Sequence, residues 1–155
     1  VKVAGVISAL SPSNRWSRNV TDAENLCRVF ASGSDIDALK VSTFGRNKEK
    51  AVKILQGENV LEVLGGLKVT SFFNCIIGDW ESVCVDGHAY SIWLGERVPT
   101  TKTPSISPSL YYAIADDYRK AAHQINGILG EEYSPAQIQA ITWVVWRNLH
   151  KGESK

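Results

Sequence analysis

Residues Leu64–Leu94 read LGGLKVTSFFNCIIGDWESVCVDGHAYSIWL, and this stretch decides how the rest of the chain is interpreted. Two adjacent glycines separate a short apolar segment from the longer apolar run Val69–Ile77. Glycine permits backbone conformations that other residues avoid, so this order predicts two helices joined by a hairpin at Leu64–Lys68. Asp86 follows directly before a third helical segment, where it is placed to cap that helix.

Apolar residues recur with helical spacing along most of the chain. The best strand candidate, Ser82–Val85, is too short to found a sheet. The sequence therefore predicts an all-α fold, a compact helical bundle containing a helix–hairpin–helix motif. Outside Leu64–Leu94 we expect helices over Val3–Leu10, from a cap at Thr21-Asp22 to Gly33, over Ala38–Val41, from Arg46 to Gly57, after a cap at Asn59, and after the pairs Ser107-Pro108 and Ser134-Pro135.

Length and composition indicate one domain over residues 1–150, followed by a frayed tail at 151–155. No apolar run approaches the roughly 18–20 residues that span a bilayer, and the N-terminus lacks the layout of a signal peptide. We therefore expect no membrane association and a cytoplasmic location. The three cysteines lie in apolar surroundings, which suits buried thiols in a reducing compartment.

The net charge and the spacing of the cysteines and histidines argue against two further classes of function. The formal net charge of +1 argues against a strong non-specific nucleic-acid binder, which usually has a surplus of lysine and arginine. There is no Cys-x-x-Cys pair and the three histidines are scattered, so we expect no metal site.

The glycine hairpin is a candidate phosphate-binding site. Gly65, Gly66 and Leu67 can leave backbone N–H groups uncovered at the start of a helix, where the helix dipole favours phosphate binding. Lys68 adjoins this point and adds a positive charge. The alternative is that the two glycines only form a tight turn between packed helices.

Leu64–Leu94 resembles the helix–hairpin–helix superfamily of base-excision DNA glycosylases, in which the hairpin is followed by an aspartate. Here that aspartate is Asp86, in Val85-Asp86-Gly87-His88. The resemblance extends over roughly residues 3–95 and includes Phe44-Gly45-Arg46-Asn47-Lys48 upstream. It implies an intracellular protein of a bacterium or an infecting phage that binds double-stranded DNA. It also implies a monovalent cation held by hairpin carbonyls, and no other cofactor.

The chain departs from the superfamily pattern at several positions. Gly65 replaces the usual proline of the hairpin, and Lys68 replaces its second glycine. Thr70 stands where strand-cleaving members have a lysine, so no lyase activity is expected. The cysteines of an iron–sulfur cluster are absent.

Asp86 is the candidate catalytic residue. Breaking an N-glycosidic bond develops positive charge on the sugar, and a carboxylate nearby can stabilise that charge or activate a water. Asp86 can also be only a helix cap, and both roles can hold at once. His88 is a candidate pocket residue, with a helix-terminal hydrogen bond as the alternative.

Several other residues are candidates for DNA contact. Asn14, Arg15 and Trp16 occupy the position of a superfamily loop that enters the opened duplex, although Trp16 can equally pack on the next helix. Lys48 can line a DNA groove, or it can belong to a solvated helix face. Trp143 can form a pocket wall against a flipped base, or it can pack in the core.

These observations predict a monofunctional DNA N-glycosylase, a base-excision repair hydrolase acting on a damaged or modified base. Two alternatives stay open. One is a phage-type enzyme on the same fold that takes part in DNA base modification by kinase or pyrophosphorylase steps. The other is a non-catalytic helix–hairpin–helix domain that only binds DNA.

Overall fold

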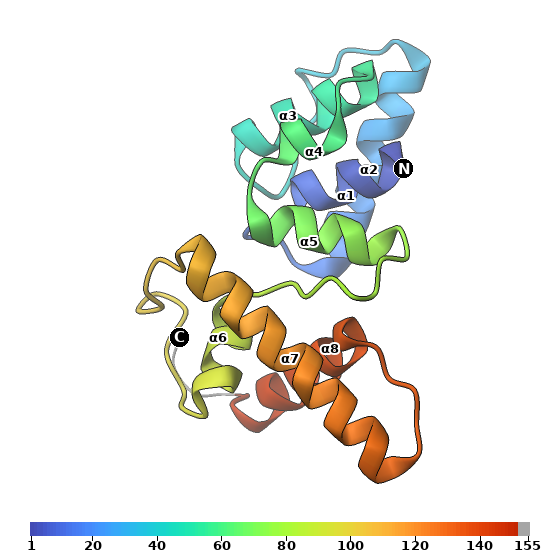
Figure 1. Ribbon diagram of the computed structural model, residues 1–155. Coiled ribbons are helices and arrows are strands. Elements are labelled where there is room, and N and C mark those ends of the chain that lie inside the picture. The colour runs from blue at the N-terminus through green and yellow to red at the C-terminus, as the bar shows by residue number, and fades with distance from the viewer. Residues whose placement is uncertain (152–155) are drawn as a thin grey trace. The chain divides into compact units, whose positions relative to one another are not determined.

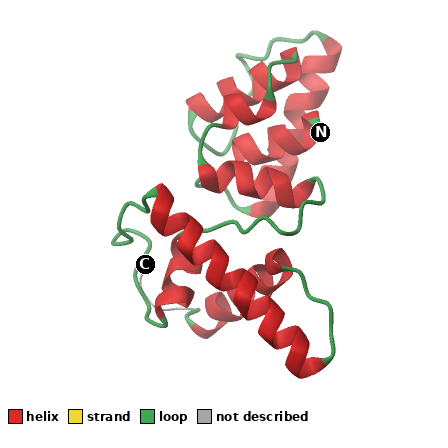
Figure 2. Cartoon of the chain, viewed as in Figure 1, coloured by secondary structure: helices red, strands yellow, loops and turns green. Residues whose placement is uncertain are grey.

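A computed structural model of the chain describes residues 1–151. Within this range the chain forms helices and no strand, which confirms the all-α prediction (Figure 2). The helices fall into two compact units, Val1–Ile77 and Gly78–Lys155 (Figure 1). Their bounds are α1 Lys2–Leu10, α2 Trp16–Ser32, α3 Gly45–Gln56, α4 Val60–Leu64, α5 Leu67–Ile76, α6 Gly87–Leu94, α7 Pro108–Leu129 and α8 Pro135–Leu149.

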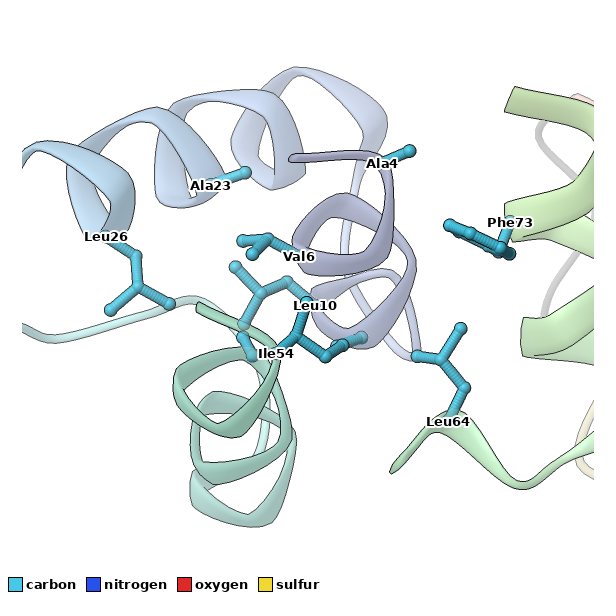
Figure 3. Packing of buried hydrophobic residues seen from close by; sticks show 10 residues of the cluster. Ala4, Val6, Leu10, Ala23, Leu26, Ile54, Leu64 and Phe73 are labelled. Carbon is cyan, nitrogen blue, oxygen red and sulfur yellow. The ribbon is translucent and has the colours of Figure 1, made fainter. Parts of the chain in front are cut away.

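Helix α1 is the central element of the first unit and contacts each of α2, α3, α4 and α5. Its sequence is apolar on nearly all sides, which is typical of a helix surrounded by others. Val6 and Leu10 are fully buried and pack with Ile54 of α3 (Figure 3). Gly5 allows the close approach of α4, because a Cβ there would lie 2.9 Å from a methyl group of Val60.

The second unit is built on α7, the longest helix of the described chain. One face of α7 buries Tyr111, Ile114 and Tyr118. Helix α8 packs against both α6 and α7, and α6 also contacts α7. The segment 95–107 joins α6 to α7 without regular structure, as its two prolines predict.

Most predicted helix starts are confirmed. Asn59, Asp86, Ser107 and Ser134 each accept a hydrogen bond from a backbone N–H in the first turn of the helix that follows. At α8 the bond is reciprocal, because Gln137 also accepts from the Ser134 backbone N–H. Such caps are local interactions, which explains why the sequence reveals them.

Two predicted elements are wrong. The second helix begins at Trp16 instead of after Thr21-Asp22, since Asp22 is buried and its carboxylate binds Asn14 and the Ser42 backbone N–H. The predicted helix over Ala38–Val41 is a turn and loop. Carbonyls of this loop bind the Lys48 ammonium instead of continuing a helical pattern.

The single domain over residues 1–150 stays a prediction. Most of the predicted tail, 152–155, lies outside the described residues. Among the described residues, no helix combines the length and the apolar character that a membrane crossing would require.

Candidate functional site

The Asp86 carboxylate lies at the N-terminus of α6 and is half-buried. Its Oδ1 accepts the backbone N–H of Ala89 at 2.8 Å, which caps the helix. Its Oδ2 accepts the indole N–H of Trp143 at 3.0 Å, from α8. An ionised carboxylate has about four acceptor positions. Each oxygen therefore keeps acceptor capacity after these two bonds.

The segment before Asp86 is held by a buried tyrosine. The Tyr111 hydroxyl donates to the Val83 carbonyl at 2.9 Å and accepts the Val85 N–H at 3.1 Å. Val83 and Val85 are themselves buried. Because the backbone before Asp86 is tied to α7, the aspartate has a defined place relative to the helices of its unit.

The segment after α6 is fixed just as closely. The buried Ser91 hydroxyl lies within hydrogen-bond distance of the Gly87 and Val98 carbonyls, which share its one proton, and it accepts the Val98 N–H. At Gly87 an added Cβ would lie 3.0 Å from the Thr103 hydroxyl oxygen, so the 99–103 loop approaches α6 closely. A side chain at this position would have to displace Thr103, so packing against this loop favours glycine next to Asp86.

Trp143 is held in place by two further side chains. The His88 ring packs against it in an edge-to-face arrangement, with centroids 5.8 Å apart. The Arg147 guanidinium lies over the indole ring, 4.6 Å from its centroid. One face of Trp143 is thus covered by the exposed Arg147 side chain, and a flipped base that stacked there would have to displace it.

Tyr118 of α7 lies close to the same carboxylate. Its hydroxyl donates to the Ala89 carbonyl at 3.3 Å. Burial, with a smaller contribution from the charge of Asp86, raises the pKa of Tyr118 to about 12. Tyr118 therefore stays neutral in the physiological range and serves as a hydrogen-bond donor.

This arrangement defines what the Asp86 site can do. A half-buried carboxylate is oriented by two N–H groups, one of which belongs to an indole ring that packs against His88. Such a group can stabilise a developing positive charge or accept a proton from a water. The structure brings Asp86, His88 and Trp143 together, because Trp143 contacts both of the other side chains.

Comparison with known proteins gives one result. Residues 1–150 match the sequence pattern of DUF7178, which is described as a family of unknown function. The chain belongs to this family. No curated protein and no solved structure matches the chain.

In the first unit, the predicted hairpin of the DUF7178 protein is shorter than expected. Only Gly65 and Gly66 lie outside the helices, since Leu67 and Lys68 belong to the first turn of α5. Gly65 has a φ of +69°, which favours glycine, whereas Gly66 has an ordinary φ of −100°. Both glycine N–H groups donate to α4 carbonyls, of Leu61 and Leu64. These two amides are therefore occupied, unlike the uncovered glycine N–H groups that the sequence predicts for phosphate binding.

The Leu64 carbonyl at this turn is also occupied. It accepts the Lys50 ammonium at 2.8 Å in addition to the Gly66 N–H at 2.9 Å. A bound monovalent cation would compete with that ammonium for the same oxygen. This carbonyl does not fit the expectation of a cation held by the hairpin.

The predicted DNA-contacting loop lies between α1 and α2. Asn14 donates to the Leu10 carbonyl and to Asp22, so its amide group holds the loop in place. Arg15 and Trp16 are exposed, and Trp16 packs edge-to-face with Phe72 of α5 at 6.3 Å. The loop therefore lies beside α5, the helix that begins at the glycine turn.

Lys48 is held within the first unit. Its ammonium donates to the Leu39 carbonyl at 2.6 Å and to the Asp37 carbonyl at 3.4 Å. These bonds tie the 35–43 loop to α3. They give Lys48 a structural role that the sequence does not reveal, because its acceptors are backbone atoms of a loop predicted to be helical.

Two hollows of the first unit do not involve these candidates. An apolar groove of about 400 Å³ lies between α1 and α2, and its lining includes Val3, Ile7 and Cys27. A smaller hollow of about 230 Å³ is lined by residues of α2 and Ser42. Within residues 1–151 there is no group of three or more histidine, cysteine or acidic side chains able to hold a metal ion.

The residues that support Asp86 are not evident from the sequence. Helical periodicity indicates only that Tyr111 and Tyr118 face inward, and no pattern singles out Ser91. The sequence does indicate that both tyrosines have a hydrogen-bond partner, since a buried hydroxyl needs one. Their partners are backbone groups beside Asp86, and periodicity does not identify such partners.

Proposed function

We propose that this protein is a monofunctional DNA N-glycosylase-like hydrolase that removes a damaged or modified base from double-stranded DNA. The observation that supports the proposal best is the Asp86 carboxylate, half-buried and oriented by the Ala89 N–H and the Trp143 indole N–H. A second support is the order of elements, in which a two-glycine turn between helices precedes this aspartate along the chain.

The proposed reaction is hydrolysis of the bond between the base and C1′ of the sugar. As this bond breaks, positive charge develops on the sugar, and Asp86 stabilises it electrostatically or accepts a proton from the attacking water. A new bond forms between the water oxygen and C1′, and the base leaves with its bonding electron pair and gains a proton. Because Thr70 replaces the lysine of strand-cleaving enzymes, the product is an intact abasic strand.

The test uses a panel of duplexes, each carrying one damaged or modified base. Incubation with the protein followed by alkali is expected to cleave the strand at the position of one such base. Asp86→Asn should lower this rate by about 10²–10⁴-fold, the usual contribution of a positioned acid–base group. Binding to the same duplex should persist, because the amide keeps the size of the side chain.

A matched control exists in the same unit. Asp117 also accepts a tryptophan N–H, from Trp93 at 2.9 Å, but it is exposed on α7. Asp117→Asn should leave the rate of abasic-site formation unchanged. Equal activity of the wild-type protein and Asp86→Asn would contradict the proposed role of Asp86.

A second candidate is an enzyme that takes part in DNA base modification through a kinase or pyrophosphorylase step. It is favoured by one observation, the contribution of Trp143 to the Asp86 site from α8, a helix outside the part that resembles DNA glycosylases. This enzyme would act on a nucleotide or a phosphorylated base and would leave the duplex panel intact. Salt-dependent DNA binding without either reaction would instead support the non-catalytic helical domain.

A further inference from the structure

The carboxylate plane of Asp86 is set by two donors from different helices. The Ala89 N–H donates to Oδ1, through which Asp86 caps the helix. This single bond leaves the carboxylate free to rotate about the Cβ–Cγ bond, because that torsion angle is broadly distributed in aspartate. The Trp143 N–H binds Oδ2 and removes that freedom. Holding a reacting group in one orientation contributes to catalysis, and a displacement of about 1 Å can cost about 100-fold in rate.

Trp143 is itself held on more than one side. It lies one helical turn before Arg147, so both side chains are on the same face of α8 and the guanidinium lies over the indole. The His88 ring, two residues after Asp86 in α6, packs edge-to-face with the indole. Four side chains from two helices therefore form one connected group: Asp86, His88, Trp143 and Arg147.

We infer that Trp143 is the positioning residue of the Asp86 site, and that Arg147 and His88 keep its indole N–H directed at the carboxylate. The inference rests on the proposed function in assigning Asp86 to catalysis, whereas the contact can be tested without any activity. It predicts that loss of the indole N–H lowers kcat, since Asp86 stays present but its carboxylate is no longer held in one orientation.

The contact is tested by nuclear magnetic resonance on the full chain labelled with ¹⁵N, in which each of the five tryptophans gives one indole N–H signal. Asp86→Asn replaces an acceptor oxygen and should shift the Trp143 signal and speed its exchange with water. Asp117→Asn should do the same to Trp93 and leave Trp143 unchanged. A Trp143 signal that ignores Asp86→Asn would overturn the inference, whatever the activity of the protein.

The consequence for catalysis is tested with Trp143→Phe, which keeps an aromatic ring for Arg147 and His88 but has no N–H. On the substrate found in the duplex panel, kcat should fall by about 10- to 100-fold while KM changes less than about twofold. The matched variant Trp93→Phe should change neither constant. An unchanged kcat in Trp143→Phe would overturn the inference, even if Asp86→Asn proves inactive.

Failure of the proposed function and failure of the inference about Trp143 give different results. If the Trp143 signal responds to Asp86→Asn and no duplex is cut, the proposed function is wrong and the Trp143–Asp86 contact stands. If Trp143→Phe unfolds, circular dichroism reveals it, and Arg147→Gln then serves as the second variant. That change keeps the N–H but removes the cation over the ring, and it should lower kcat by a smaller factor. A kcat equal to the wild-type value in Arg147→Gln would then overturn the inference.

Discussion

Asp86 makes a structural contact through each carboxylate oxygen, and the proposed function assigns a chemical task to the same side chain. As a helix cap it satisfies the Ala89 N–H, which would otherwise lack a partner in the first turn of α6. As an acceptor of the Trp143 indole it links α6 to α8. A single substitution can therefore reduce stability and activity together, and the two effects have to be separated by the choice of variant.

Asp86→Ala is expected to lower the free energy of unfolding by about 1–3 kcal/mol, because it removes the cap and leaves the Trp143 N–H without an acceptor. Asp86→Asn should cost about 1 kcal/mol less, since an amide oxygen still caps the helix. Urea unfolding of both variants measures the difference. Equal losses would indicate that the cap contributes nothing to stability.

Tyr118 makes stability depend on alkaline pH. Burial raises its pKa from the ordinary value of 10.0 to about 12, so the folded protein holds this proton more tightly than the unfolded chain. The resulting stabilisation is fully present below pH 10 and is lost as pH rises toward 12. Tyr118→Phe lacks this titration.

The free energy of unfolding of the wild-type protein should therefore fall relative to Tyr118→Phe by about 1 kcal/mol between about pH 9 and 11. Chemical unfolding at the two pH values measures this change. Burial also raises the pKa of Cys27. Cys27 is present in both proteins, so its titration cancels in the comparison with Tyr118→Phe. A constant difference between the two proteins would contradict the prediction.

At the scale of elements, the connection between α4 and α5 depends on one glycine more than on the other. Gly65 has a left-handed backbone with φ +69°, whereas Gly66 is extended and a Cβ added there would meet no other atom within 4 Å. We expect Gly65→Ala to cost about 1 kcal/mol and Gly66→Ala to be nearly neutral. Thermal unfolding of the two variants compares them directly, and equal effects would contradict this account of the turn.

The start of α8 is the second element with a testable interaction. Ser134 and Gln137 exchange side-chain-to-backbone hydrogen bonds, and Pro135 occupies the first helical position. Ser134→Ala should reduce the free energy of unfolding by about 0.5–2 kcal/mol. Gln137→Ala, which removes only the return bond, should cost less. Hydrogen exchange of α8 amides locates the loss, and a loss confined to another helix would contradict the assignment.

For the whole molecule, the question is how far the two units unfold together. Ile54→Ala leaves a cavity in the fully buried core of the first unit and should cost about 2–5 kcal/mol there. Hydrogen exchange reports the loss separately for each helix. An equal loss of protection in α7 and α8 would support the single domain predicted over residues 1–150. Unchanged protection in those helices would contradict it.

Interactions within a few residues of each other could be predicted from the sequence. The caps at Asn59, Asp86, Ser107 and Ser134 satisfy backbone groups two or three residues away, so the residue type and the apolar pattern after it reveal them. The all-helical fold follows from the same local periodicity. The exception is Asp22, whose residue type predicts a cap but whose carboxylate binds a loop 20 residues away.

Contacts between residues far apart in the sequence could be identified only from the tertiary structure. Trp143 reaches Asp86 across 57 positions, and Lys48 binds carbonyls of a loop that the sequence predicts as helix. Such pairs arise from the packing of helices, which depends on the shapes of many side chains at once and has no local period. Composition and pattern therefore determined the helices and their caps, and the resemblance to DNA glycosylases pointed to one carboxylate, while packing decided which groups hold that carboxylate.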